Sequence, residues 1–231
     1  MTTQSIEQHI VGPLGSDFWQ IKVPPELVPA MAREIDWNRL GRRVMIDVGE
    51  GIIAWMNPSG PHEDLGHASD KVVEVAGDVL SILVKAKRGT RWKGPEDPKN
   101  TGLEADAAFY IGDKAEKWFA ARRKGLKAVE DFEAITPPDL VIEVEITHLD
   151  VNKPRSYAKL GIQEMWRIER NTTDEVIRIA ILDLQADGGP QDVRESKVLT
   201  GLTNSNLPEA YELAEYGQFK TLKDILTDEL V

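Results

Sequence analysis

The chain has 231 residues, of which 41% are hydrophobic and 29% are charged, and this is enough for one globular α/β domain with a full core. It has no cysteine, which excludes disulfide bonds and thiolate metal sites, and its net charge of −11 argues against a protein that coats nucleic acid by bulk attraction. No apolar run reaches the roughly 20 residues of a membrane helix and the N-terminus lacks a signal pattern, so we expect a cytoplasmic protein.

Strands and helices alternate along the sequence. Residues 1–40 are an irregular lead-in that contains a short helix over 26–35. The other predicted elements are strands over 43–48 and 51–56, a long helix over 68–87, a strand over 104–111, a helix over 114–124, an acidic strand within 137–147, a helix over 153–160, strands over 164–169 and 175–185, and a helix after Phe219. This order is typical of a mixed-sheet α/β domain. We expect a single domain over 1–231, with its core and active site over 41–170 and C-terminal strands and a helix over 171–231.

The long helix is predicted most clearly. Apolar residues recur in it at helical spacing: Val72, Val75, Ala76, Val79, Leu80 and Leu83. His62 and Glu63 precede this predicted helix, where they could line a site or serve as a cap or hinge.

The acidic strand carries two glutamates on an otherwise apolar segment. Side chains on a strand alternate between its faces, and one face here is apolar throughout: Leu140, Ile142, Val144 and Ile146. Glu143 and Glu145 share the other face. A buried carboxylate needs a cation, either a metal ion or a basic side chain. Lys153 opens the next helix, ten positions after Glu143.

Asp106 lies on the preceding predicted strand, on the face opposite Phe109. If the two acidic strands pair, Asp106 and Glu143 can hold one divalent cation, and oxygen ligands favour Mg²⁺ or Mn²⁺. Such an ion would activate a water and neutralise a phosphate oxygen, while a lysine stabilises the transition state. The alternative is a salt bridge at the strand end, in which Lys153 neutralises Glu143 or Glu145.

The segment PPDLVIEVEITHLDVNKPRSYAKLGIQEMWRIE resembles the core of the Uma-type restriction-endonuclease family, within the PD-(D/E)XK nuclease superfamily. After a Pro-Asp and an acidic strand, that family has a helix with K-x-x-x-Y-x-x-x-G and a closing E-x-W. The matching residues here are Lys153, Tyr157, Gly161, Glu164 and Trp166. GLEADAAFYIG, with Asp106, and DVGEGIIAWMNPSGPHE, with Glu50, Pro58 and His62, match further family segments. The resemblance runs from about residue 47 to residue 170.

This resemblance implies a restriction-endonuclease-like fold, a mixed β-sheet flanked by helices, and a Mg²⁺- or Mn²⁺-dependent endonuclease that hydrolyses phosphodiester bonds in DNA. Asp106 and Glu143 would be the metal ligands, and Lys153 the active-site lysine, moved onto the following helix. Glu145 stands where the superfamily has its lysine, so it is either a third metal ligand or the partner of Lys153. Further residues that could line the site are Glu50, His62 and Glu63.

Two basic groups could contact DNA. The Lys85 group, which also contains Trp92, comprises Lys85, Lys87, Arg88, Arg91 and Lys93. The Arg122 group comprises Arg122, Arg123, Lys124 and Lys127. Both also fit a solvated surface, and cations at a helix C-terminus are favoured by the helix dipole without any ligand.

Two other functions are alternatives to a nuclease. A non-cleaving nucleic-acid-binding or regulatory module could keep the same fold, although the intact acids and lysine argue against it. A metal-free hydrolase is disfavoured because acids at positions i and i+2 project in parallel and cannot flank a scissile bond. A homodimer could supply a second wall for the DNA groove.

Overall fold

The computed structural model describes residues 18–34, 43–47, 49, 51–56, 60–87, 91–92, 103–145, 153–170 and 176–230. The chain divides into two compact units. The first comprises Met1–Ser59 with Arg91–Glu104, and the second comprises Gly60–Thr90 with Ala105–Val231. The single domain over 1–231 stays a prediction. Among the described helices, none is both long enough and apolar enough to cross a bilayer.

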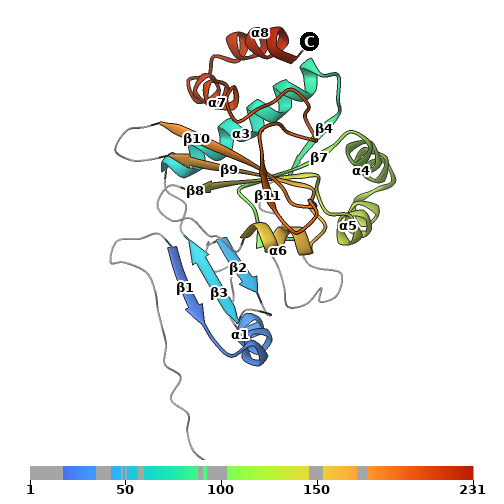
Figure 1. Ribbon diagram of the computed structural model, residues 1–231. Coiled ribbons are helices and arrows are strands. Elements are labelled where there is room, and N and C mark those ends of the chain that lie inside the picture. Colours follow the sequence, from blue (N-terminus) through green and yellow to red (C-terminus); the bar gives the residue numbers. More distant parts are fainter. Residues whose placement is uncertain are drawn as a thin grey trace, which may run out of the picture. The chain divides into compact units, whose positions relative to one another are not determined.

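A small antiparallel sheet with the strand order β1-β3-β2 forms the first unit (Figure 1). Its elements are β1 (Phe18–Lys22), η1 (Pro25–Leu27), α1 (Val28–Glu34), β2 (Arg43–Asp47), β3 (Ile52–Met56) and the strand pair β5 (Arg91–Trp92) and β6 (Leu103–Glu104). Four apolar side chains form its core: Val23, Val28, Ile46 and Ile53. The strands predicted over 43–48 and 51–56 are confirmed, whereas β1 falls in the segment that was predicted as irregular.

A mixed six-stranded sheet with the order β11-β10-β9-β8-β7-β4 forms the second unit (Figure 1). Its strands are β4 (Val84–Lys87), β7 (Ala107–Ile111), β8 (Leu140–Glu145), β9 (Glu164–Arg170), β10 (Ile177–Asp183) and β11 (Gln191–Val193). Its helices are α3 (Gly60–Val79), α4 (Asp113–Lys124), α5 (Leu126–Ile135), α6 (Lys153–Lys159), α7 (Leu207–Glu215) and α8 (Phe219–Leu230). Neighbouring strands are antiparallel except β8 and β9, which are parallel and connected through α6.

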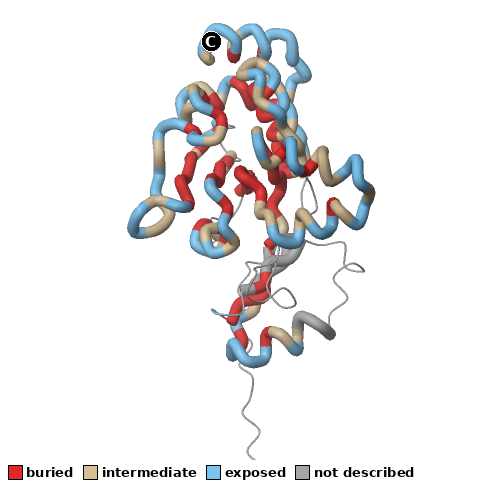
Figure 2. The backbone as a smooth tube through the Cα atoms, turned by 90° about the vertical axis from the view of Figure 1, so that its right-hand side faces the viewer, coloured by how far each residue is buried: buried red, intermediate tan, exposed pale blue. Residues whose placement is uncertain are grey.

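Helices cover both faces of this sheet. The core between the sheet and α3, α7 and α8 includes Leu140, Ile142 and Val144 of β8. On the opposite face, Tyr110 of β7 packs edge-on against Phe132 of α5, with ring centroids 5.3 Å apart. In Figure 2 the deeply buried residues, in red, are concentrated in the strands and on the inner sides of the helices. The fold is therefore α/β with a mixed sheet flanked by helices, as the sequence predicted.

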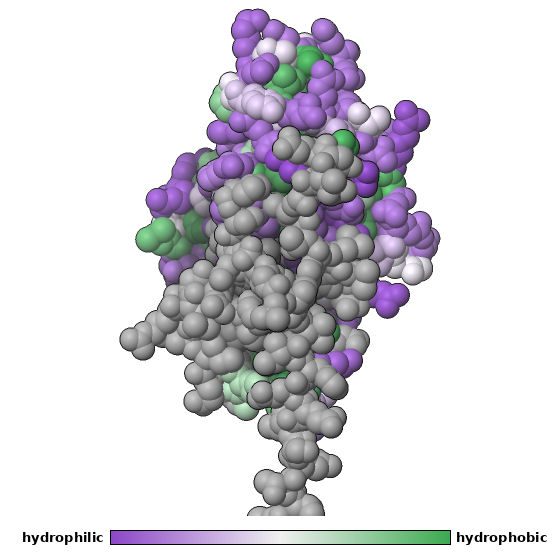
Figure 3. All heavy atoms as spheres, turned by 90° about the vertical axis from the view of Figure 1, so that its left-hand side faces the viewer, coloured by the Kyte–Doolittle hydropathy of each residue, from purple (hydrophilic) through white to green (hydrophobic). Residues whose placement is uncertain are grey.

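The C-terminal helices α7 and α8 are amphipathic. Figure 3 shows one face of the molecule, where the outer surface near the C-terminus, at the top, is mainly hydrophilic. The apolar sides of the two helices reach the core through Tyr211, Leu222 and Leu226.

The long helix differs from its prediction at both ends. α3 begins at Gly60 and ends at Val79, and residues 84–87 form β4 instead of helix. The helix ends because Ser81 adopts a φ of 56° and the Ile82 N–H donates to the Gly77 carbonyl at 2.8 Å, which closes the last turn. Leu80 and Leu83 continue the apolar spacing past the helix end, although Leu83 is 45% exposed, so the spacing alone could not locate that end.

Candidate active site

β8 places its two glutamates on the face of the sheet that α6 covers. Glu143 and Glu145 are 1% and 7% exposed, so both carboxylates are taken out of water. Burying a charge without a partner is costly. Each of these two carboxylates accordingly lies beside a basic side chain.

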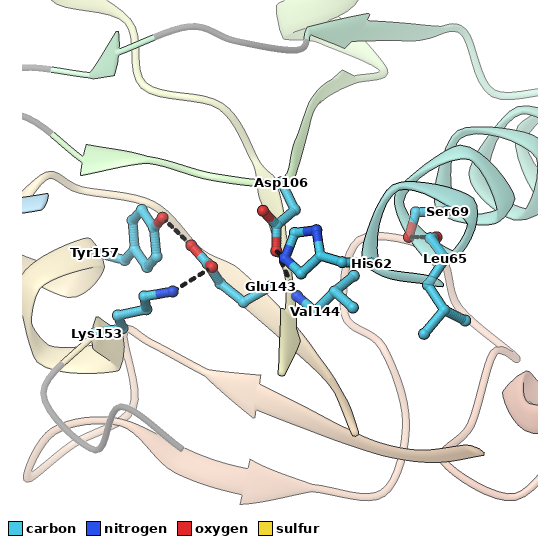
Figure 4. Close-up of polar contacts among 8 residues, drawn as sticks. All are labelled: His62, Leu65, Ser69, Asp106, Glu143, Val144, Lys153 and Tyr157. Atoms are coloured by element: carbon cyan, nitrogen blue, oxygen red, sulfur yellow. Dashed lines mark hydrogen bonds and ion pairs between the residues drawn. The ribbon is translucent and has the colours of Figure 1, made fainter. Parts of the chain in front are cut away.

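Two residues of α6 bind the two carboxylate oxygens of Glu143 (Figure 4). Lys153 Nζ donates to Oε2 at 2.6 Å, and the Tyr157 hydroxyl donates to Oε1. Lys153 and Tyr157 are four residues apart, which places both on the same side of the helix. Of the two ion pairs that the sequence left open for Lys153, the structure contains the one with Glu143.

Asp106 lies in a bend directly before β7, not within a strand as predicted. Its Oδ2 accepts a hydrogen bond from the backbone N–H of Val144 at 2.6 Å and lies 3.2 Å from Nε2 of His62 (Figure 4). His62 is in the first turn of α3 rather than before the helix, because α3 starts earlier than predicted. Both side chains are buried, so the start of α3 and the end of β8 fix the position of Asp106.

Glu145 has a partner that the sequence analysis missed. Its Oε2 lies 3.3 Å from Nε of Arg167 on β9, and the two side chains are 4% and 12% exposed. Trp166 and Ile168 belong to the core, so alternation places Arg167 on the opposite face with Glu145. The alternation in the sequence places Arg167 on this face of its strand. Only the parallel pairing of β8 with β9 identifies it as the partner of Glu145.

The predicted metal ligands Asp106 and Glu143 each lie next to a paired position of β7 and β8. Ala107 pairs with Ile142 across β7 and β8, so these two acids are the next residues along the same strand pair. Within the described ranges, no group of three or more His, Cys, Asp or Glu side chains is arranged to hold a metal ion. An ion shared by the two carboxylates therefore stays a prediction.

Asp139, the acid of the Pro-Asp pair, lies at the other end of β8 and stabilises the fold. Its Oδ2 accepts from the backbone N–H of Ile111 at 2.9 Å, and its Oδ1 lies 3.1 Å from Nζ of Lys114. These contacts connect β8 to the end of β7 and to the first turn of α4.

The remaining predicted site residues have different outcomes. Glu63 is half-buried in the first turn of α3, near His62 in the sequence. Glu50 lies outside the described residues. A site-lining role for these residues stays a prediction.

The Lys85 group is partly engaged within the protein. Lys87 Nζ lies 2.7 Å from Glu133 of α5, and Lys85 Nζ lies 4.6 Å from the centroid of the Trp118 ring. Burial lowers the pKa of Lys85, and the neighbouring charge of Lys87 lowers it further. Arg91 is in β5, while Arg88 and Lys93 lie outside the described residues. By contrast, the members of the Arg122 group are exposed.

Comparison with known proteins agrees with the motifs. Residues 35–215 match the model of the family described as "Putative restriction endonuclease" (Uma2), and the chain belongs to this family. Among solved structures, it resembles the crystal structure of a "putative nuclease belonging to DUF820" from Anabaena variabilis. The two share 18% sequence identity and a TM-score of 0.47, over 73% of this chain and 90% of that chain. A search of curated proteins finds no match. The predicted family and the restriction-endonuclease-like fold are confirmed.

Proposed function

We propose that the protein is a metal-dependent endonuclease that hydrolyses phosphodiester bonds in DNA. The observation that carries the proposal is the buried carboxylate of Glu143, which binds the Lys153 ammonium at 2.6 Å. Glu143 and Asp106 adjoin the paired residues Ile142 and Ala107 of β8 and β7. These are the acids and the lysine that the family motif assigns to catalysis. Their burial at one place in the fold supports a shared chemical role.

The side chains at this place fit Mg²⁺ or Mn²⁺. Magnesium prefers oxygen ligands and usually keeps several waters, so one or two protein carboxylates are sufficient to hold it. Asp106 and Glu143 supply such oxygens, and the chain has no cysteine that would favour a softer metal. An ion held by these two residues would supply positive charge at the scissile phosphate.

Lys153 has two roles in this proposal. Before DNA binds, its ammonium neutralises the buried carboxylate of Glu143. The lysine side chain is 14% exposed and the glutamate 1%, so the lysine is the partner that can turn toward a phosphate. There its charge would stabilise the negative charge that develops during cleavage.

Glu145 acts through Arg167 in this proposal. The 3.3 Å ion pair holds the guanidinium on the same face of the sheet as Glu143, close to where a phosphate would bind. Glu145 is thus a positioning residue that keeps a second cation near the site. The proposal also retains the sequence-based expectations of a cytoplasmic location and a homodimer.

Cleavage assays test the proposal. The full-length protein is incubated with supercoiled, linear and single-stranded DNA in Mg²⁺, in Mn²⁺ and in EDTA. We expect cleavage that requires the ion and disappears in Asp106→Ala. The matched control Asp131→Ala, which removes an exposed acid of α5, should cleave like the wild type. DNA binding without cleavage would instead favour the non-cleaving module, and neither binding nor cleavage would contradict both functions.

A further inference from the structure

We infer that Tyr157 is a positioning residue of this site, whose hydroxyl holds the Glu143 carboxylate in the orientation that binds the metal ion. The inference rests on the proposed function, because it concerns the same carboxylate. The hydroxyl donates to Oε1 of Glu143 (Figure 4). The tyrosine is fully buried.

Tyr157 and Lys153 hold the same carboxylate by different chemistry. The Lys153 ammonium is charged, so it repels a divalent ion that approaches Glu143. The Tyr157 hydroxyl donates a hydrogen bond without carrying the positive charge of an ammonium group, so it does not repel the ion. A carboxylate oxygen has two lone pairs, so Oε1 can accept from Tyr157 and also bind a cation. The tyrosine is therefore the donor that is compatible with an occupied metal site.

Burial also distinguishes the two donors. Lys153 is 14% exposed and can swing into solvent, whereas Tyr157 is 0% exposed. The backbone of Tyr157 is fixed as well, because its carbonyl accepts from the N–H groups of Leu160 at 3.1 Å and Ile162 at 3.3 Å where α6 ends. The tyrosine contact would therefore keep Glu143 in place if the carboxylate bound an ion instead of the lysine.

Calorimetric titration of Mn²⁺ into the metal-free full-length protein, without DNA, tests this role. Tyr157→Phe removes only the hydroxyl oxygen. Loss of a residue that orients a metal ligand typically costs 10–100-fold in metal affinity, so we expect Mn²⁺ to bind about 10–100-fold more weakly. Saturating Mn²⁺ should restore most of the cleavage rate, because the variant loses ion affinity and keeps every charged group.

Tyr211→Phe is the matched control. Tyr211 is also fully buried, and its hydroxyl donates to Ser69 Oγ at 3.0 Å on the opposite side of the sheet. This variant should keep the wild-type Mn²⁺ affinity. If the two variants weaken Mn²⁺ binding equally, the effect reflects general packing and the inference fails.

A second measurement does not depend on the folding of Tyr157→Phe. The chain has four tyrosines, so the ¹³Cζ resonance of Tyr157 in labelled wild-type protein can be assigned by elimination, with Phe variants of the other three. Substoichiometric Mn²⁺ should broaden this resonance before the others, and selective broadening elsewhere would contradict the inference.

The failures of the inference and of the proposed function are distinguishable. Wild-type Mn²⁺ affinity in Tyr157→Phe overturns the inference and leaves the proposed function standing. Wild-type protein that binds no Mn²⁺ overturns both.

Discussion

Removal of Lys153 leaves Glu143 buried without its charged partner, so we predict that Lys153→Ala destabilises the metal-free protein. The ammonium and carboxylate are 2.6 Å apart, and the two side chains are 14% and 1% exposed. Breaking a buried ion pair costs about 3–5 kcal/mol. We expect the lower value, about 3 kcal/mol, because the lysine is partly exposed and Tyr157 keeps its hydrogen bond. In a protein of this size about 1 kcal/mol changes Tm by roughly 2–4 °C, so Tm should fall by about 6–12 °C.

Differential scanning calorimetry in EDTA measures this change against a matched variant. Lys71→Ala breaks an exposed ion pair with Glu74, whose side chains are 48% and 47% exposed, and should cost at most about 1 kcal/mol. Saturating Mn²⁺ should return part of the lost stability to Lys153→Ala, because an ion that binds the folded state replaces the missing charge. Equal Tm values for the two variants would refute the reasoning, since Glu143 would then not depend on its lysine.

Three further predictions concern the surroundings of the site. Arg167→Met should lower the free energy of unfolding by about 3 kcal/mol, and adding Glu145→Leu should recover most of this loss. A double variant that is as unstable as the single variant in urea denaturation would contradict a coupled pair. Alanine substitutions in the Lys85 group should reduce the magnitude of the slope of log K for DNA binding against log salt concentration by about 0.7–0.9 per lost phosphate contact. An unchanged slope would indicate that the Arg122 group contacts the DNA instead. Burial raises the pKa of the Glu164 carboxyl, against hydrogen bonds from Ser196, Lys197 and Trp166 that lower it. The folded state then holds the proton more tightly than the unfolded chain, so this stability is present below pH 4.5 and lost as pH rises through the folded pKa. Glu164→Gln should flatten that decline in a pH series of melts, and an unchanged slope would show that another group is responsible.

The faces of β8 could be predicted from the sequence, because alternation along a strand is a local property. Glu143 and Glu145 are on the face opposite the core, as predicted. Lys153 could be predicted as a partner for the same reason, since it opens the helix that immediately follows this strand. The ordered motif then identified the family without any knowledge of tertiary contacts.

Features that depend on contacts distant in sequence could not be predicted. Prediction of Arg167 as the partner of Glu145 required the register between β8 and β9. This register places Arg167 opposite Glu143, and Glu145 is the next residue on the same face of β8. The end of α3 required knowledge that β4 packs back over Gly77, where a Cβ atom would lie 2.5 Å from Val84.

Three elements lie in parts of the sequence for which no element was predicted: α5, α7 and β11. α7 nevertheless has a readable start, because Pro208 lies in its first turn and Glu209 follows it.

Anomalous scattering from Mn²⁺ tests most directly whether Asp106 and Glu143 share one ion. Crystals of the full-length protein would be soaked in Mn²⁺ and measured at the manganese absorption edge, with Glu143→Gln crystals treated in the same way. We predict one strong peak bonded to both carboxylates in the wild type and a weak or absent peak in the variant. A peak bonded elsewhere, or equal peaks in both proteins, would contradict the proposed metal site.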